Sequence, residues 1–171
     1  LIKPTKGNLY LDDKVISSKE DIRKYQNMIT FISQDTFLVE DTIKNNITFF
    51  SDSDLDEEKL NFAIKFAKVD KFLSEFKEGL DYKVGSHSRR ISSGQRQRIA
   101  IARSIYNLKD ILVFDEATNA LDQENENFII ENLYKLKNVT IILVSHNLKL
   151  LKSCHKIYNL SDGKLLLKDI N

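Results

Sequence analysis

The sequence has very little cysteine and proline. Cys154 is its only cysteine and Pro4 its only proline in 171 residues. A single cysteine excludes an intramolecular disulfide, so the fold must rest on a packed core, and this usage is typical of a reducing compartment. Cys154 lies in a mostly apolar stretch, where a packed thiol is a better interpretation than a nucleophile.

Long hydrophobic runs and an excess of one charge are also missing. No apolar run approaches the ~20 residues that a membrane-spanning helix needs, and no signal peptide is visible. Lys and Arg number 26 against 25 Asp and Glu, for a net charge of +1, which argues against a dedicated nucleic-acid surface. The first residue is Leu1 rather than methionine, so we expect the sequence to be part of a larger protein.

The hydrophobic pattern predicts an α/β fold. β-rich apolar runs predict buried strands at residues 28–33, 110–115 and 139–144, and apolar residues at helical spacing predict helices at 93–106 and 123–136. The last strand, helix and strand form a βαβ unit with parallel strands. Weaker signals predict a strand at 8–13, a helix at 18–26 capped by Ser18, and a terminal hairpin turning at Asp162-Gly163.

A second region has a different pattern. Strand signals vanish between residues 41 and 107, where we expect short helices near 41–47, from Glu57 to Ala67 and near 72–76, then a loop at 79–88. The sequence therefore predicts a single domain over 1–171, with an α/β core at 1–40 and 108–171 and an inserted helical lobe at 41–107.

Polar side chains follow three of the predicted strands at their carboxyl ends. These residues are Gln34, the pair Asp115-Glu116, and His146. Ligands of open parallel sheets bind beyond these strand ends, so we expect the groups to meet at one edge. Asp115 can hold Mg²⁺, Glu116 can polarise a water, His146 can donate to a terminal phosphate, and Gln34 can bond both metal and water.

The start of the predicted helix at residue 93 offers a phosphate site. Ser92 and the backbone N–H groups of Ser93 and Gly94 can bind an anion where the helix dipole favours negative charge, followed by Gln95. Taken alone, this stretch is a plain helix cap, and an Asp-Glu pair after a strand is a solvated turn. Occurring together and in this order, the motifs favour an ATP-hydrolysing site.

Nearly the whole chain resembles the nucleotide-binding domain of an ATP-binding cassette (ABC) transporter. Residues 91–95 resemble the family's signature motif, usually Leu-Ser-Gly-Gly-Gln, and Ile111 to Glu116 resemble Walker B with its catalytic glutamate. Residues 119–122, ending at Asp122, resemble the D-loop, Gln34 the Q-loop and His146 the switch histidine. The resemblance implies a P-loop NTPase (RecA-like) core with an inserted helical signature subdomain, binding ATP and Mg²⁺.

The resemblance also implies partners and a location. Residues 37–47 and 83–85 resemble the exporter branch, in which the Q-loop and the loop before the signature touch a membrane domain. It therefore implies membrane-spanning helices, fused upstream, at the cytoplasmic face of a membrane such as the bacterial inner membrane. It further implies a head-to-tail dimer in which residues 92–95 face the nucleotide of the second domain. No nucleic-acid partner is expected.

The sequence departs from the family at three points. Ser93 replaces the first signature glycine, Ser86 and His87 replace the acidic and basic residues usual in exporters, and no Gly-x-x-x-x-Gly-Lys-Ser/Thr occurs anywhere. That P-loop anchors the triphosphate through its lysine and backbone N–H groups. We therefore interpret the chain as lacking its N-terminal strands and P-loop, and expect it alone to bind ATP weakly without hydrolysing it. His87 and His155 are assigned no role.

Two other functions remain possible at this point. One is an ABC-type ATPase without a membrane partner, such as a chromosome-maintenance or translation factor, although neither a long coiled coil nor a second cassette is present. The other is a non-catalytic regulatory cassette, against which the intact Glu116 and His146 argue. The transported substrate meets the membrane helices, so lipid-linked sugar, lipid, peptide and drug all stay open, as does a homodimer or heterodimer.

Overall fold

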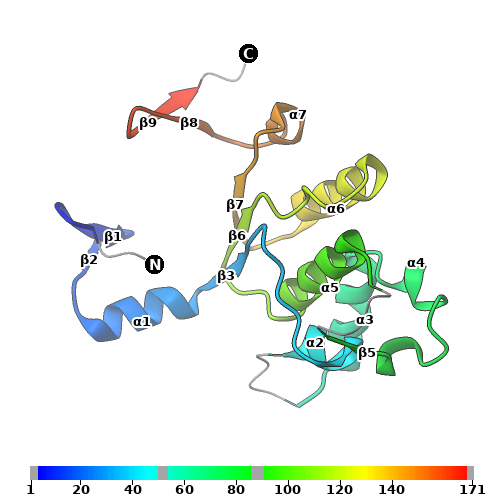
Figure 1. Ribbon diagram of the computed structural model, residues 1–171. Helices are drawn as coiled ribbons and strands as arrows, with labels where there is room; N and C mark the ends of the chain where they lie inside the picture. Colours follow the sequence, from blue (N-terminus) through cyan, green and yellow to red (C-terminus); the bar gives the residue numbers. More distant parts are fainter. Residues whose placement is uncertain (1–3, 50–53, 86–90, 169–171) are drawn as a thin grey trace.

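A parallel sheet lies at the centre of the computed structural model, which describes residues 4–49, 54–85 and 91–168. Its strands are ordered β3 (Ile29–Ile32), β6 (Ile111–Asp115) and β7 (Thr140–Val144). Helix α6 (Gln123–Lys135) connects β6 to β7 (Figure 1). The predicted βαβ unit with parallel strands is therefore confirmed.

The two faces of this sheet differ in burial. Ile32, Leu112 and Phe114 are at most 3% exposed, and α5 (Ser93–Tyr106) and α6 lie on one side of the sheet in Figure 1. Ile142 and Val144 point to the opposite face and are 48% and 44% exposed. The prediction that the third strand is buried is therefore wrong, because the described helices cover only one face.

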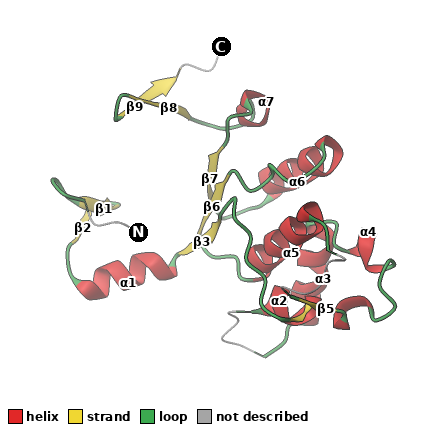
Figure 2. Cartoon of the chain, in the orientation of Figure 1, coloured by secondary structure: helices red, strands yellow, loops and turns green. Residues whose placement is uncertain are grey.

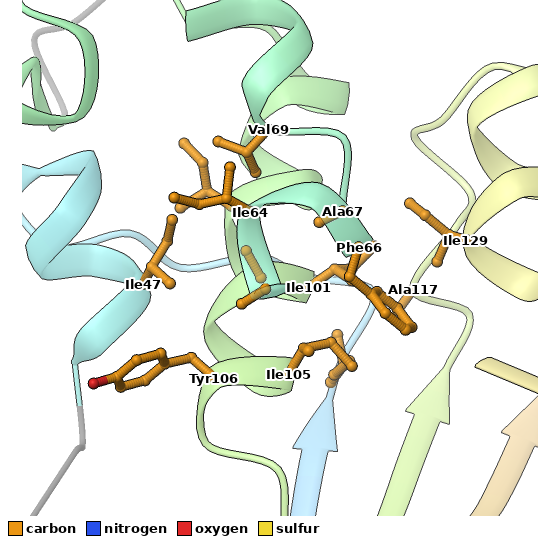
Figure 3. Packing of buried hydrophobic residues seen from close by; sticks show 14 of the residues in the cluster. Ile47, Ile64, Phe66, Ala67, Val69, Ile101, Ile105, Tyr106, Ala117 and Ile129 are labelled. Carbon is orange, nitrogen blue, oxygen red and sulfur yellow. The ribbon is translucent and has the colours of Figure 1, made fainter. Parts of the chain in front are cut away.

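In the region between residues 41 and 107, shorter elements pack around the long helix α5. It contains α2 (Ile43–Thr48), α3 (Glu57–Phe66), α4 (Asp70–Leu73) and the 3₁₀ turn η1 (Gly79–Asp81). Figure 3 shows Ile47, Ile64 and Ile101 of α2, α3 and α5 packed together, all at most 5% exposed. The apolar positions predicted from helical spacing thus bury one face of each helix, while the division into core and lobe stays a prediction.

Two short strands correct the prediction for this region. β4 (Asp41–Thr42) and β5 (Lys83–Val84) pair in antiparallel fashion, with Thr42 opposite Lys83. Strands are therefore present between residues 41 and 107 although the sequence shows no strand signal there. The first helix begins at Ile43 rather than Asp41, and the predicted loop contains η1 and β5. Strands of two residues are too short to show an alternating pattern. Ser86 and His87 lie outside the described residues.

Side-chain caps explain where most of the helices begin. The oxygen of the residue before the helix accepts a backbone N–H of its first turn, which otherwise has no intrahelical acceptor. Ser18 does this for α1 (Lys19–Asn27), as predicted. The same cap is made by Thr42 for α2, Asp56 for α3, Ser92 for α5 and Asp122 for α6.

Two hairpins lie apart from the central sheet, as Figure 2 shows. β1 (Leu9–Leu11) pairs with β2 (Lys14–Ile16), and β8 (Ile157–Ser161) pairs with β9 (Lys164–Lys168). Positive φ angles of 50° at Asp162 and 72° at Gly163 confirm the predicted Asp-Gly turn. The short helix α7 (Leu148–Leu151) was not predicted. None of the described helices has the length and apolar character needed to cross a membrane.

Candidate functional site

The parallel register brings the predicted site residues to one edge of the sheet. Ile32 lies beside Phe114, and Phe114 lies beside Leu143. Gln34 follows Ile32 by two residues and is exposed, Asp115 is the last residue of β6, and His146 follows β7 by two residues. The three strands therefore share one sheet as expected, whereas the roles of these residues stay predictions.

Glu116 is the most constrained residue at this edge. Its backbone has a φ of 48°, and its N–H donates to the carbonyl of Val144 at 3.0 Å. Left-handed backbone is costly for a residue with a side chain and is concentrated at functional sites. Hydrogen bonding across to β7 holds the turn after β6 in this conformation, so the Glu116 side chain has a defined starting direction.

Both carboxylate oxygens of Glu116 have partners. Oε1 lies 2.8 Å from Nε2 of His146, and Oε2 accepts a hydrogen bond from Nδ2 of Asn119 at 2.8 Å. The Glu116 side chain is 19% exposed. Because a carboxylate offers about four lone-pair sites, Glu116 can keep both contacts and still accept a hydrogen bond from a water.

Asn119 begins the segment that resembles the D-loop, but its contact with Glu116 was not predicted from the sequence. It lies three residues after Glu116, and its N–H donates to the Glu116 carbonyl at 3.2 Å, so a tight turn returns its side chain to the carboxylate. The predicted partner of His146 was a phosphate, whereas the structure shows His146 against Glu116. In the sequence, the resemblance of residues 119–122 to the D-loop is the signal that points to Asn119.

The side-chain oxygens of Asp115 and Gln34 are suited to Mg²⁺ that binds together with a nucleotide. Among the described residues, no group of three or more His, Cys, Asp and Glu side chains is arranged to hold a metal. Mg²⁺ bound to phosphates usually takes only one or two protein oxygens and keeps several waters. Asp115, half-buried at the end of β6, and the exposed Gln34 amide are suited to that limited role.

The start of α5 is a capping box. The Ser92 hydroxyl accepts from the backbone N–H of Gln95 at 3.2 Å, and Oε1 of Gln95 accepts from the Ser92 N–H at 3.0 Å. The first intrahelical bond runs from Arg96 to Ser92, so within this helix the N–H groups of Ser93 and Gly94 precede the hydrogen-bond ladder. The capping interpretation is therefore correct, and phosphate binding by the same turn stays a prediction.

Gly94 brings this helix start against the D-loop-like segment. A Cβ added at Gly94 would lie 3.1 Å from the carbonyl oxygen of Ala120, so a larger residue would push the two apart. Asp122 ends the segment by capping α6, accepting from the N–H of Asn125 at 2.9 Å. This backbone bond, followed by the Asn125 side chain, lowers the pKa of Asp122, and the Arg98 and Lys68 charges lower it further.

Two other polar side chains hold the edge of the sheet through contacts that have no sequence signature. Glu126 of α6 accepts from Oγ1 of Thr118 at 2.7 Å and from Nδ2 of Asn147 at 3.4 Å, which joins the segments after β6 and β7. Gln97 of α5 bonds to Thr36 and to the carbonyl of Ala117. Such pairs join residues far apart in the chain, so no local pattern predicts them.

A pocket of about 280 Å³ opens beside the segment that follows Gln34. Phe37 stands at this pocket with 72% of its surface exposed. The lining also includes residues from β5 and from the start of the signature region, among them Thr36, Leu38, Val84, Gly85, Ile91 and Arg96. An exposed aromatic ring at the rim of a pocket is typical of an interaction surface.

The chain is similar in sequence to ATP-dependent transport proteins. The chain is 38% identical over 165 residues to an ATP-dependent lipid A-core flippase of Legionella pneumophila (strain Paris), covering 95% of this chain and 27% of that protein. It is 36% identical over 166 residues to the leukotoxin translocation ATP-binding protein LktB of Mannheimia haemolytica, covering 95% of this chain and 23% of that protein. The chain thus spans about a quarter of the length of these relatives.

A solved structure and a family model agree with these relatives. The structure of a bacterial Atm1-family ABC exporter with ATP bound superposes with a TM-score of 0.84 at 30% identity, over 95% of this chain and 29% of that chain. The model of the ABC transporter family matches residues 1–119. The chain therefore belongs to the ABC transporter family, and its α/β fold is the P-loop NTPase fold of an exporter nucleotide-binding domain.

Proposed function

We propose that the full-length protein is an ABC exporter in which this domain hydrolyses ATP to drive transport across a membrane. The observation that carries the proposal is the contact between Glu116 and His146, at the carboxyl edge of the sheet and beside Asp115. A regulatory cassette would not need a carboxylate held on both oxygens. The names of the relatives, a flippase and a toxin translocation protein, support export.

In the proposed reaction Glu116 polarises the attacking water. Asn119 and His146 fix the direction of the Glu116 carboxylate, and a positioned base of this kind contributes roughly 10²–10⁴-fold to a rate. His146 can also turn toward a terminal phosphate, because its side chain is 92% exposed. Asp115 and Gln34 would hold Mg²⁺. When bound, that ion neutralises charge on the phosphate oxygens.

The signature turn would act on the nucleotide of a second domain. Ser92 and Ser93 are exposed, and the N–H groups of Ser93 and Gly94 precede the helical ladder of α5. A helix start of this kind binds phosphate. Gly94 lies against the carbonyl of Ala120, so the signature and the D-loop-like segment form one continuous surface. We place the partner domain of a head-to-tail dimer on this surface.

The pocket at Phe37 would receive the membrane domain. It lies between the segment that carries Gln34 and the strand β5 that precedes the signature. A membrane segment bound there would contact both the segment that carries Gln34 and the strand that precedes the signature. With a membrane domain seated there, the proposed domain would lie at the cytoplasmic face of a membrane, and in a bacterium at the inner membrane. Replacing Phe37 with Ala is expected to lower transport more than ATP hydrolysis, since the ring is exposed.

The test is ATP hydrolysis by the full-length protein. Glu116→Gln is expected to lower kcat by roughly 10²–10⁴-fold while nucleotide binding persists, because only the base is lost. Glu131→Gln is the matched control, since Glu131 is an exposed residue of α6. A full-length protein that binds ATP but does not hydrolyse it, or a Glu116→Gln variant as active as Glu131→Gln, would contradict the proposal.

A further inference from the structure

Gln97 is a buried polar side chain with both ends of its amide engaged. It lies on α5 and is 3% exposed. Its Oε1 accepts from the Thr36 hydroxyl at 2.5 Å, and its Nε2 donates to the carbonyl of Ala117 at 2.6 Å. A carbonyl can only accept, so Ala117 fixes which end of the amide faces it. Thr36 must then be the donor to Oε1.

The two partners of Gln97 lie next to the candidate catalytic residues. Thr36 follows Gln34 by two residues, and Ala117 follows Glu116 directly. Ala117 is fully buried, and Figure 3 shows it beside Phe66 and Ile129. On the Ala117 side the Gln97 amide therefore bonds directly to buried backbone. On the Thr36 side it bonds to the hydroxyl of a residue two positions after Gln34, so one amide links the two segments of the site.

The helix that carries Gln97 also carries the signature turn. Ser92 caps α5, and Gln97 lies five residues later on the same rigid helix. Two segments of the ATP site are thus held against one helix whose first turn faces a second domain in the proposed dimer. The Gln97 amide joins the two segments through one part-buried and one buried hydrogen bond. Breaking either bond is costly, because it leaves a polar group without a partner.

We infer that Gln97 is a positioning residue that sets the Gln34 and Glu116 segments relative to the signature helix. It touches no reacting atom, and it acts through Thr36 and Ala117. The inference rests on the proposed ATP hydrolysis and deepens it, since it assigns to Gln97 the alignment of the metal-holding and water-polarising groups. A misplacement of about 1 Å in such groups can cost about 10²-fold in rate.

The experiment measures kcat and KM for ATP in the full-length protein carrying Thr36→Val or Gln97→Leu. Thr36→Val removes one hydroxyl and keeps the Ala117 bond, so we expect kcat to fall about tenfold with KM little changed, and Gln97→Leu to cost about 10²-fold. Thr48→Val and Gln26→Leu are the matched controls. The Thr48 hydroxyl donates to the Lys44 carbonyl within α2, away from the candidate site, and Gln26 is exposed on α1.

A second measurement separates positioning from a loss of folded protein. In the Gln34→Ala background, Thr36→Val should lower the remaining hydrolysis no further, because the Gln34 amide that Thr36 positions is already gone. A variant that merely reduces the folded fraction would lower activity by the same factor in both backgrounds, and would lower the number of ATP-binding sites. That result, or a Thr36→Val variant equal to Thr48→Val, would overturn the inference. Absence of any hydrolysis sensitive to Glu116→Gln would instead contradict the proposed function.

Discussion

Replacing His146 with Ala should remove activity and leave stability almost unchanged. The His146 side chain is 92% exposed and touches Glu116 at 2.8 Å. An exposed pair of this kind contributes about 0–1 kcal/mol to folding, so the free energy of unfolding should change by less than about 1 kcal/mol. His146 is not part of the buried core that contains Leu112 and Phe114, so its removal should leave that core intact.

The expected effect on catalysis is much larger. His146 contacts one oxygen of Glu116 and lies at the edge where the phosphate would bind. Loss of one preorganised donor costs about 10²–10³-fold in kcat, or about 2.7–4 kcal/mol. The same side chain is therefore expected to matter several times more for the transition state than for folding.

Two measurements on the full-length protein test this difference. One is urea unfolding followed by circular dichroism, and the other is steady-state ATP hydrolysis. His155→Ala is the matched control, because His155 is an exposed histidine away from the sheet edge. A His146→Ala variant with normal kcat would refute the assigned role, and one that unfolds several kcal/mol more easily would refute the reasoning from exposure.

Three further predictions concern the core, the acid response and the turn after β6. Phe114→Ala should cost about 3–5 kcal/mol in urea unfolding, because Phe114 is fully buried, whereas Phe62→Ala at a ring 51% exposed should cost far less. The Ser18 hydroxyl, and then Lys14, lower the pKa of Asp21 from 3.8 to about 2, so the Asp21 contribution to stability is complete above pH 3.8 and is lost as the pH falls through about 2. Asp21→Asn should therefore flatten the acid dependence of stability in that window, and an unchanged profile would contradict it. Asn119→Leu should lower kcat about tenfold by releasing one oxygen of Glu116, and Asn119→Asp should lower it further through like charge; normal kinetics in both would contradict the positioning of Glu116.

Local sequence signals predicted the regular elements well. The strands β6 and β7 are β-rich apolar runs, and α5 and α6 combine helical spacing with caps at Ser92 and Asp122. Hydrophobic periodicity and capping are properties of neighbouring residues, so they are visible in one sequence. The parallel pairing of β6 with β7 followed from the short βαβ connection.

Long-range features were not predictable in the same way. The pairing of Thr42 with Lys83 and the bond of Thr36 to Gln97 join residues that are 41 and 61 positions apart. Only the folded chain brings such residues together. One-sided burial of β7 was also missed, because Ile142 and Ile141 are equally apolar in sequence although only Ile142 is exposed.

The sequence predicted that four candidate residues lie at one sheet edge, but not which side chains contact one another; their roles stay predictions. Gln34, Asp115, Glu116 and His146 were placed at one edge by the strand ends alone. The contacts of Glu116 with His146 and Asn119 depend on the left-handed turn at Glu116, which no sequence pattern indicated.

The most direct measurement is a structure of the full-length Glu116→Gln protein bound to Mg²⁺ and ATP. The sheet-edge site predicts Mg²⁺ at about 2.0–2.1 Å from an oxygen of Gln34, of Asp115 or of a water bonded to Asp115. The terminal phosphate should lie within hydrogen-bond distance of His146. Nucleotide bound away from the carboxyl ends of β3, β6 and β7 would contradict the assignment of all four residues.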